Sequence, residues 1–359
     1  GMRIIGWMLT RMIMMRFIML MFGICAFFIT LDVFTYADEV LAINGGQLGA
    51  LGKYALLLLP NAASTFLALC VLLSLLLTLI ELSYRSETVA LWASGVPPLR
   101  ILLMLLPLGA LLGGVNFLIN DQAVTRASPV LHTWGIGDYG KKQLKIGEQD
   151  LIWMRADNDI LRAVGSNPQA TELKDVTIFR RDEKGLLIEQ IMADKAVLMN
   201  DRWELTDVVI YYQENLLPNR VKTFIYSGTM RPAPIGARSG DPEEMSLNDL
   251  EYFIINSGFG IRPAHVYQTW WHKRVSLLTS AWLMIALCLP LAVRYRRGGG
   301  IAVILGFGIA IGFSFFIFDG ISLTIGELGI VPPWMAAWTP VLVFSGLAAS
   351  LMMRAETVS

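Results

Sequence analysis

Four carboxylates lie in or beside long apolar stretches, where an ionised side chain is costly and therefore often has a function. Asp32 and Asp319 lie within such stretches, and Asp38 and Glu39 follow the first one. Carboxylates in this setting could exchange protons with a substrate, as in a lipid-modifying enzyme, or could shape the mouth of a path for a polar molecule. Near the membrane surface, each could equally be an ordinary solvated carboxylate.

The catalytic and metal-binding motifs that an enzyme would need are missing from the sequence. There is no GxxxxGK[ST] phosphate loop, no HExxH and no GxSxG, and no nucleophile accompanies the carboxylates. His132, His265 and His272 are too scattered along the chain to predict a metal site. We therefore expect no catalytic residue, no metal and no cofactor bound by this chain.

A charged segment between two apolar stretches predicts a short helix at residues 81–95. Ser86 can cap this helix, Glu87 lies in the first turn, where the helix dipole favours an acid, and Gly95 can end it. Such a helix, joined at both ends to membrane spans, could dock another protein and transmit force. The alternative is an amphipathic turn on the lipid surface, although such helices usually favour Lys and Arg. The residues assigned to docking are Arg85, Ser86, Glu87, Ala90 and Gly95.

The composition is that of an integral membrane protein. The chain has 359 residues, of which 55% are hydrophobic and only 16% are charged, below the roughly 25% of a soluble domain. The 29 basic and 29 acidic residues cancel, so no positive field points to nucleic acid. Six apolar stretches are long enough to cross a bilayer as helices, at residues 12–36, 54–80, 97–119, 275–293, 301–317 and 334–353.

The basic residues of the short loops predict that both termini are cytoplasmic, because Lys and Arg are retained on that side. The opposite short loops contain only Lys53, whereas the cytoplasmic segments contain Arg3, Arg11, Arg16, Arg85, Arg100, Arg294, Arg296, Arg297 and Arg354. In this orientation the segment 81–95 faces the cytoplasm and the polar middle of the chain lies outside.

The polar middle of the chain changes from a helical to a strand pattern. Short β-rich runs alternate around turn clusters at 182–185 and 200–202, as in antiparallel hairpins. Strands without intervening helices favour a sandwich or an open barrel. We predict three domains: transmembrane helices 1–3 at residues 1–119, an all-β domain at 120–272, and transmembrane helices 4–6 at 273–359.

Small residues spaced four apart predict close packing of two of the spans. Gly109 with Gly113, and Gly308 with Gly312, each form a small-xxx-small face. The second pair could be a mobile seam, although ordinary helix packing is the favoured explanation.

The sequence resembles a known family, the inner-membrane permeases of lipopolysaccharide export of the LptF/LptG type, and the LptG-like branch more closely. The segment "RSETVALWASGVPPLRI" resembles the coupling helix of that family. The segment "FFIFDGISLTIGELGIVPPWMAAWTPVLVF" resembles its fifth and sixth spans. The resemblance covers nearly the whole chain.

The resemblance implies six transmembrane helices with an inserted periplasmic β-jellyroll, in the inner membrane of a Gram-negative bacterium. It implies a transport subunit that carries lipopolysaccharide, while ATP is used by a separate LptB-like ATPase dimer. Further implied partners are a second, LptF-like permease, a single-span LptC-like component and an LptA-like periplasmic bridge. Glu87 matches the acid of the coupling helix. The residues assigned to the lipid cavity or its gate are Asp32, Asp319, Gly308, Gly312 and Arg126.

One region departs from the family pattern. LptG-like permeases tend to have lysines near the outer end of the first span, where they can meet the phosphates of the lipid. Here the region reads "LDVFTYADEV", which has three acids and no Lys or Arg. Carboxylates repel phosphate unless divalent cations bridge them. The lipid is then less phosphorylated, or Arg126 and Lys53 supply the positive charge.

Two other functions are the alternatives. The first is a membrane-anchored scaffold or signalling protein whose β-domain binds a periplasmic ligand without coupling to an ATPase. The second is a polytopic lipid-modifying enzyme, which ranks last because nothing but the carboxylates Asp32, Asp38, Glu39 and Asp319 could serve it.

Overall fold

The computed structural model describes residues 2–84, 96–141, 151–165, 171–228, 241–255, 262–294 and 300–357. The chain divides into two compact units, Gly1–Tyr139 with Thr269–Ser359, and Gly140–Gln268. The first unit is helical, and the second contains the strands. Membrane helices with an inserted all-β domain are the fold class that the sequence predicted.

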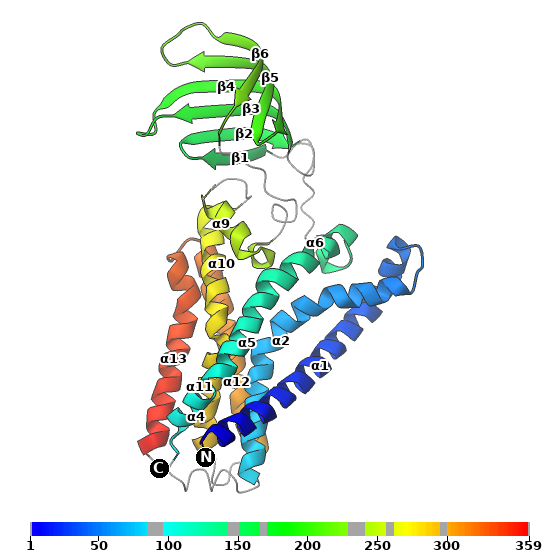
Figure 1. Ribbon diagram of the computed structural model, residues 1–359, viewed down its shortest axis with the longest axis vertical. Coiled ribbons are helices and arrows are strands. Elements are labelled where there is room, and N and C mark those ends of the chain that lie inside the picture. The colour runs from blue at the N-terminus through cyan, green and yellow to red at the C-terminus, as the bar shows by residue number, and fades with distance from the viewer. Residues whose placement is uncertain are drawn as a thin grey trace. The chain divides into compact units, whose positions relative to one another are not determined.

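The helical unit consists of long apolar helices with short connections (Figure 1). Among the described residues, five helices are long and apolar enough to cross a membrane, and the bent pair 98–104 and 106–134 provides a sixth span if it is counted as one. These match the six predicted stretches. The elements are α1 (Met2–Ile43), α2 (Gly49–Tyr84), α4 (Pro98–Met104), α5 (Leu106–Leu118), η1 (Ile119–Ala123), α6 (Val124–Trp134), α7 (Asp138–Lys141), α10 (Ala264–Ser276), η3 (Leu277–Thr279), α11 (Ser280–Arg294), α12 (Ile301–Glu327) and α13 (Pro333–Thr357).

The third span is bent by 53° at the junction of α4 and α5. Pro107 lies in the first turn of α5. Because proline has no N–H and restricts the residue before it, it interrupts the helix that precedes it. The helical path then continues through the π-helical turn η1 into α6, well past the predicted end at residue 119.

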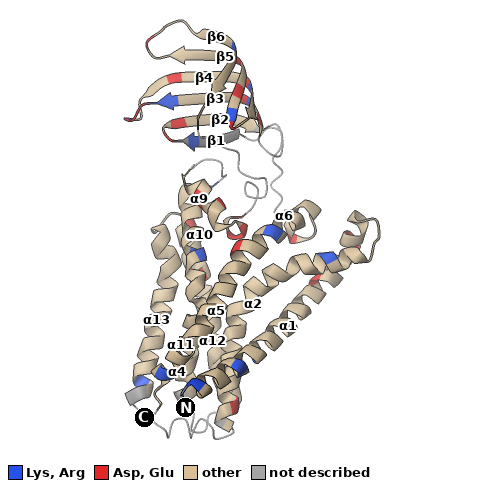
Figure 2. Ribbon diagram, in the orientation of Figure 1, with Lys and Arg blue, Asp and Glu red and all other residues tan. Residues whose placement is uncertain are grey.

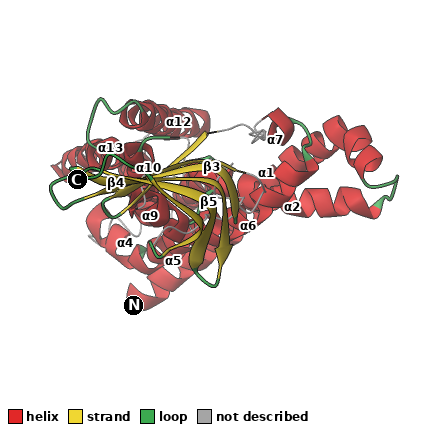
Figure 3. Ribbon diagram, turned by 90° about the horizontal axis from the view of Figure 1, so that it is seen from above, coloured by secondary structure: helices red, strands yellow, loops and turns green. Residues whose placement is uncertain are grey.

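The helices differ in how much of their apolar surface the chain itself covers. In the most apolar stretch of α2, 61% of the residues are buried, and the same fraction holds for the span formed by α10 and α11. The corresponding fractions are 11% for α1 and 22% for α12. The tip of the α1–α2 hairpin also extends away from α11, α12 and α13 (Figures 1 and 3). Large uncovered apolar faces of this kind meet lipid or another membrane protein.

The second unit contains one antiparallel sheet whose strands follow chain order. The predicted hairpin turns are confirmed, since β3 and β4 are joined at 182–186 and β4 and β5 at 200–201. Asn200 and Asp201 have φ values of 47° and 63°, as a tight type I′ turn requires. The strands are β1 (Leu151–Ala156), β2 (Asp159–Gly165), β3 (Glu172–Arg181), β4 (Leu187–Met199), β5 (Arg202–Tyr212) and β6 (Asn219–Tyr226).

The sheet curls, so that strands far apart in its order come together. The Tyr226 hydroxyl on β6 donates a hydrogen bond to Asp159 on β2 at 2.5 Å, although these strands are not neighbours. Figure 3 shows the strong curvature of the strands. Burial, with the hydrogen bond to Asp159, raises the pKa of Tyr226 above its ordinary value. The curled face buries Trp203 and Leu205.

Two short helices follow the sheet, η2 (Pro242–Glu244) and α9 (Leu247–Ile255). Ser246 caps the second, because its hydroxyl accepts a hydrogen bond from the backbone N–H of Asp249 at 3.2 Å.

Candidate functional site

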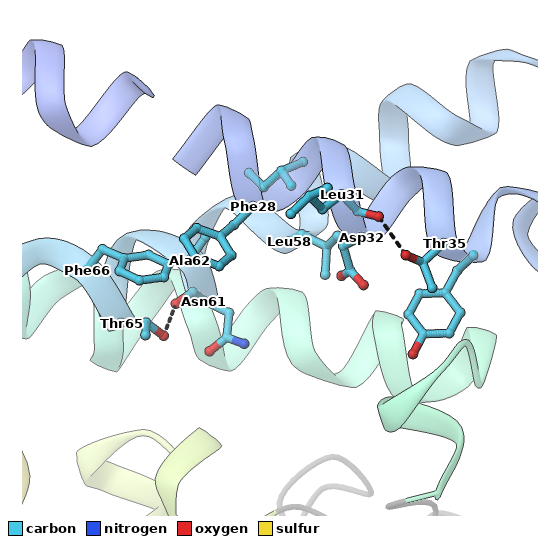
Figure 4. A pocket seen from close by; sticks show the side chains of 11 residues that line it. Phe28, Leu31, Asp32, Thr35, Leu58, Asn61, Ala62, Thr65 and Phe66 are labelled. Carbon is cyan, nitrogen blue, oxygen red and sulfur yellow. Dashed lines mark hydrogen bonds between the residues drawn. The ribbon is translucent and has the colours of Figure 1, made fainter. Parts of the chain in front are cut away.

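A cavity of about 390 Å³ lies between α1 and α2 (Figure 4). Its apolar part includes Phe28 and Phe66, whose rings stack with centroids 4.6 Å apart. Its polar part comes from one carboxylate, one amide and three hydroxyls, one of them the phenol of Tyr36. The lining residues are Phe28, Ile29, Leu31, Asp32, Thr35, Tyr36, Leu58, Asn61, Ala62, Thr65 and Phe66.

Asp32 is the charged residue of this cavity. Its carboxylate accepts a hydrogen bond from the Tyr54 hydroxyl at 3.4 Å, and Asp138 is close enough to interact with it electrostatically. Within the described part of the chain, no Lys or Arg forms an ion pair with Asp32. An ionised Asp32 therefore gives the cavity a negative charge that no lining residue neutralises.

The turn around α7 borders the same region of α1 and α2. The Asn61 amide donates a hydrogen bond to the Tyr139 hydroxyl at 3.1 Å. The backbone N–H of Gly137 donates to Glu39 at 3.2 Å. Lys53 does not line the cavity, and its ammonium lies 5.6 Å from the centroid of the Trp134 ring. Lys53, the basic residue nearest in sequence to the cavity-lining part of α2, is thus directed to an aromatic face.

Asp319 has a different environment from Asp32. It is buried on α12 and accepts a hydrogen bond from the Lys273 ammonium at 2.5 Å. Its other oxygen, Oδ1, is buried without a hydrogen-bond partner among the described residues. Asp319 is not part of the cavity lining, so the structure does not bring the two predicted carboxylates into one site.

A second ion pair lies next to the first in sequence. Arg274, with only 3% of its side chain exposed, donates to Asp121 of η1 at 3.2 Å. Lys273 and Arg274 are consecutive residues of α10, yet they bind acids on α12 and on η1. Trp270, one turn earlier, donates to Glu327 at the end of α12 at 2.6 Å. This end of α10 is therefore held to two neighbouring elements by charged or polar contacts.

Sequence reasoning missed these two ion pairs. Asp121 and Lys273 fall at the ends of apolar stretches. The predicted domain bounds placed Asp121 in the β-domain and Lys273 at the start of the last three spans. The sequence did contain one signal for these pairs, because Asp121, Lys273 and Arg274 are ionisable residues directly beside predicted spans. Their partners could not be found, because Arg274 and Asp121 are 153 residues apart in the chain.

Gly308 and Gly312 lie where α12 packs against α2. A Cβ added at Gly308 would be 2.2 Å from the Leu76 Cδ1 atom, and one added at Gly312 would be 3.0 Å from Leu72 Cδ2. Both glycines are buried and neither lines the cavity. They allow close helix packing, and a role in gating stays a prediction.

Arg126 is exposed on α6, where its guanidinium donates to Gln122 of the preceding turn at 3.4 Å. It does not line the cavity. The docking residues Arg85, Ser86, Glu87, Ala90 and Gly95 lie outside the described residues, so their role stays a prediction. Just before them, Glu81 of α2 forms an ion pair with Arg16 of α1.

Comparison with known proteins gives consistent matches. The sequence profile of the family described as lipopolysaccharide export system permease LptF/LptG matches residues 7–354. The chain is 23% identical over 334 residues to the lipopolysaccharide export system permease protein LptG of Escherichia coli K12. The aligned region covers 90% of this chain and 91% of the relative. The protein of the same name from Escherichia coli O6:H1 strain CFT073 matches with the same identity and coverage.

Proposed function

Because the chain belongs to the LptF/LptG family of lipopolysaccharide export permeases, we propose that it extracts lipopolysaccharide from the inner membrane and passes it to periplasmic β-jellyroll domains. The observation that carries this proposal is the family match, which spans the helices and the inserted sheet alike. A transport subunit explains the chain better than a scaffold or a lipid-modifying enzyme, since the family consists of permeases.

The proposed orientation has both termini in the cytoplasm and the sheet in the periplasm. The two ends of the chain lie at the same end of the helical unit (Figure 1). Lys and Arg gather at that end (Figure 2), with Arg3 and Arg11 on α1 and Arg354 on α13. Retention of basic residues on the cytoplasmic side supports this assignment.

The proposed partners are an LptF-like permease, an LptB-like ATPase dimer, an LptC-like single-span component and an LptA-like bridge. The uncovered apolar faces of α1 and α12 support pairing with other membrane helices, because each offers a long surface that this chain does not bury. ATP hydrolysis belongs to the ATPase in this scheme, and the permease supplies the lipid path.

The proposed coupling runs from Glu87 to the membrane helices. In this scheme Glu87 binds a basic residue in a groove of the ATPase. The ion pair between Glu81 and Arg16 fastens α2 to α1 a few residues earlier. A displacement of the docking segment would therefore move α1 together with α2, and these two helices enclose the cavity.

Affinity purification of the tagged full chain from native membranes tests this function. Wild type should recover an ABC-type ATPase and a second six-span permease. Glu87→Arg should lose the ATPase and keep the permease, because the variant reverses one charge at the docking site. Glu183→Arg, the same change in the exposed turn between β3 and β4, is the matched control and should keep both. Recovery of wild type without an ATPase would refute the proposal.

A further inference from the structure

We infer that the cavity between α1 and α2 binds a positively charged amine carried by the head group of the transported glycolipid. This inference rests on the proposed function and adds the chemistry of the group that the permease selects. The charge of Asp32, the hydrogen-bond acceptors of the lining and the volume of the cavity support it.

Asp32 differs from three other acids of the helical unit, which are paired with cations. Asp121, Asp319 and Glu81 each have a cationic partner, in Arg274, Lys273 and Arg16. Asp32 has the Tyr54 hydroxyl instead, and no described Lys or Arg forms an ion pair with it. A carboxylate between aromatic and aliphatic side chains is stabilised when a cation enters beside it. A positive charge that enters the cavity can therefore pair with Asp32.

The polar lining of the cavity offers more acceptors than free donors, because both threonine hydroxyls already donate to backbone carbonyls. The Thr35 hydroxyl donates to the Leu31 carbonyl, and the Thr65 hydroxyl donates to the Asn61 carbonyl. The Asn61 amide N–H donates to Tyr139. These groups still offer acceptor oxygens to a ligand, in addition to the Asp32 carboxylate. The remaining donors of the lining are the second Asn61 N–H and the Tyr36 hydroxyl. An ammonium group has three donors and no acceptor, whereas a phosphate offers acceptors. With acceptors in excess and a carboxylate among them, the cavity complements an amine better than a phosphate.

The volume of the cavity limits which part of the lipid it can hold. A cavity of about 390 Å³ lies near the lower end of the range for small-molecule sites, roughly 300 to 1,000 Å³. It can hold an amino sugar or an ethanolamine group but not an entire multi-chain glycolipid. The stacked rings of Phe28 and Phe66 provide an apolar wall beside the carboxylate (Figure 4), and an aromatic face also attracts cations.

A binding competition tests the inference. The full chain, purified with its partner subunits in lipid nanodiscs and with EDTA present, is offered two probes: lipid A whose phosphates carry an amino-sugar substituent, and lipid A with unsubstituted phosphates. Wild type should bind the amine-bearing form at least about tenfold more tightly. Asp32→Asn, which removes the charge and keeps the shape, should reduce the preference to less than about twofold. Thr35→Val removes one acceptor without changing the charge and should weaken the preference severalfold.

The matched control is Asp38→Asn, the same change at an exposed residue of α1 that does not line the cavity, and it should keep the full preference. Equal binding of both lipids by wild type would overturn this inference while leaving the transport function standing. A preference that survives in Asp32→Asn would also overturn it. The unsubstituted lipid could instead bind tightly only with Mg²⁺ in excess of the EDTA, and only when Asp32 is present. That result would overturn the amine inference in favour of a divalent cation that bridges Asp32 and a phosphate. Failure of wild type to bind either lipid would overturn the proposed function as well.

Discussion

At the scale of single residues, breaking the ion pair between Lys273 and Asp319 should strongly lower stability, because both side chains are mostly buried. Lys273→Met leaves the Asp319 carboxylate without its cation in an apolar environment. We expect a loss of about 3 kcal/mol in the free energy of unfolding, as for other broken buried pairs. Thermal unfolding of the full chain in detergent micelles measures this loss.

The double variant Lys273→Met with Asp319→Leu separates stability from function. Replacing both charges by apolar groups of similar size should restore most of the stability. If the double variant unfolds as easily as Lys273→Met alone, the pair does not account for the loss. If it is stable but fails to export lipid, the charges serve transport as predicted for Asp319. Arg126→Met, at an exposed cation, should change the free energy of unfolding by less than about 0.5 kcal/mol.

At the scale of elements, close helix contacts depend on particular glycines. A Cβ at Gly113 of α5 would lie 2.2 Å from the backbone oxygen of Leu278, whereas one at Gly114 would meet nothing within 4 Å. Gly113→Ala therefore forces α5 away from η3 and should lower the free energy of unfolding by about 2 kcal/mol. Gly114→Ala, the control in the same helix, should be neutral or slightly stabilising. Equal melting temperatures of the two variants would contradict the assigned packing.

The same scale shows which features can be predicted from a sequence. Length and hydropathy locate the spans, and turn residues such as Asn200 locate the hairpins, because both signals are local in the chain. The bend before Pro107 also has a local signal, which is the proline itself. The environments of Asp32 and Asp319 could not be told apart, since the difference arises from Lys273, a residue 46 positions from Asp319. Contacts between helices depend on the rotation of each helix, which composition does not specify.

At the scale of the whole molecule, the orientation in the membrane decides which side supplies the lipid path and which side supplies the energy. Impermeant maleimide labelling of single-cysteine variants in intact cells measures this orientation. Leu48 in the α1–α2 loop, Leu216 in the β5–β6 loop and Ile330 in the α12–α13 loop are all exposed. With a periplasmic sheet, Leu48→Cys, Leu216→Cys and Ile330→Cys should be labelled without permeabilising the inner membrane.

Tyr84→Cys, at the exposed end of α2 beside the docking segment, should be labelled only after the inner membrane is opened. The native cysteines Cys25, Cys70 and Cys288 are buried and are replaced by alanine to remove background. If Tyr84→Cys is labelled in intact cells and Leu216→Cys is protected, the chain has the opposite orientation in the membrane. An inverted chain would place Glu87 on the side without ATP, so the coupling mechanism would fail together with the orientation. The expected pattern instead places the docking segment and both termini on the side where ATP is hydrolysed.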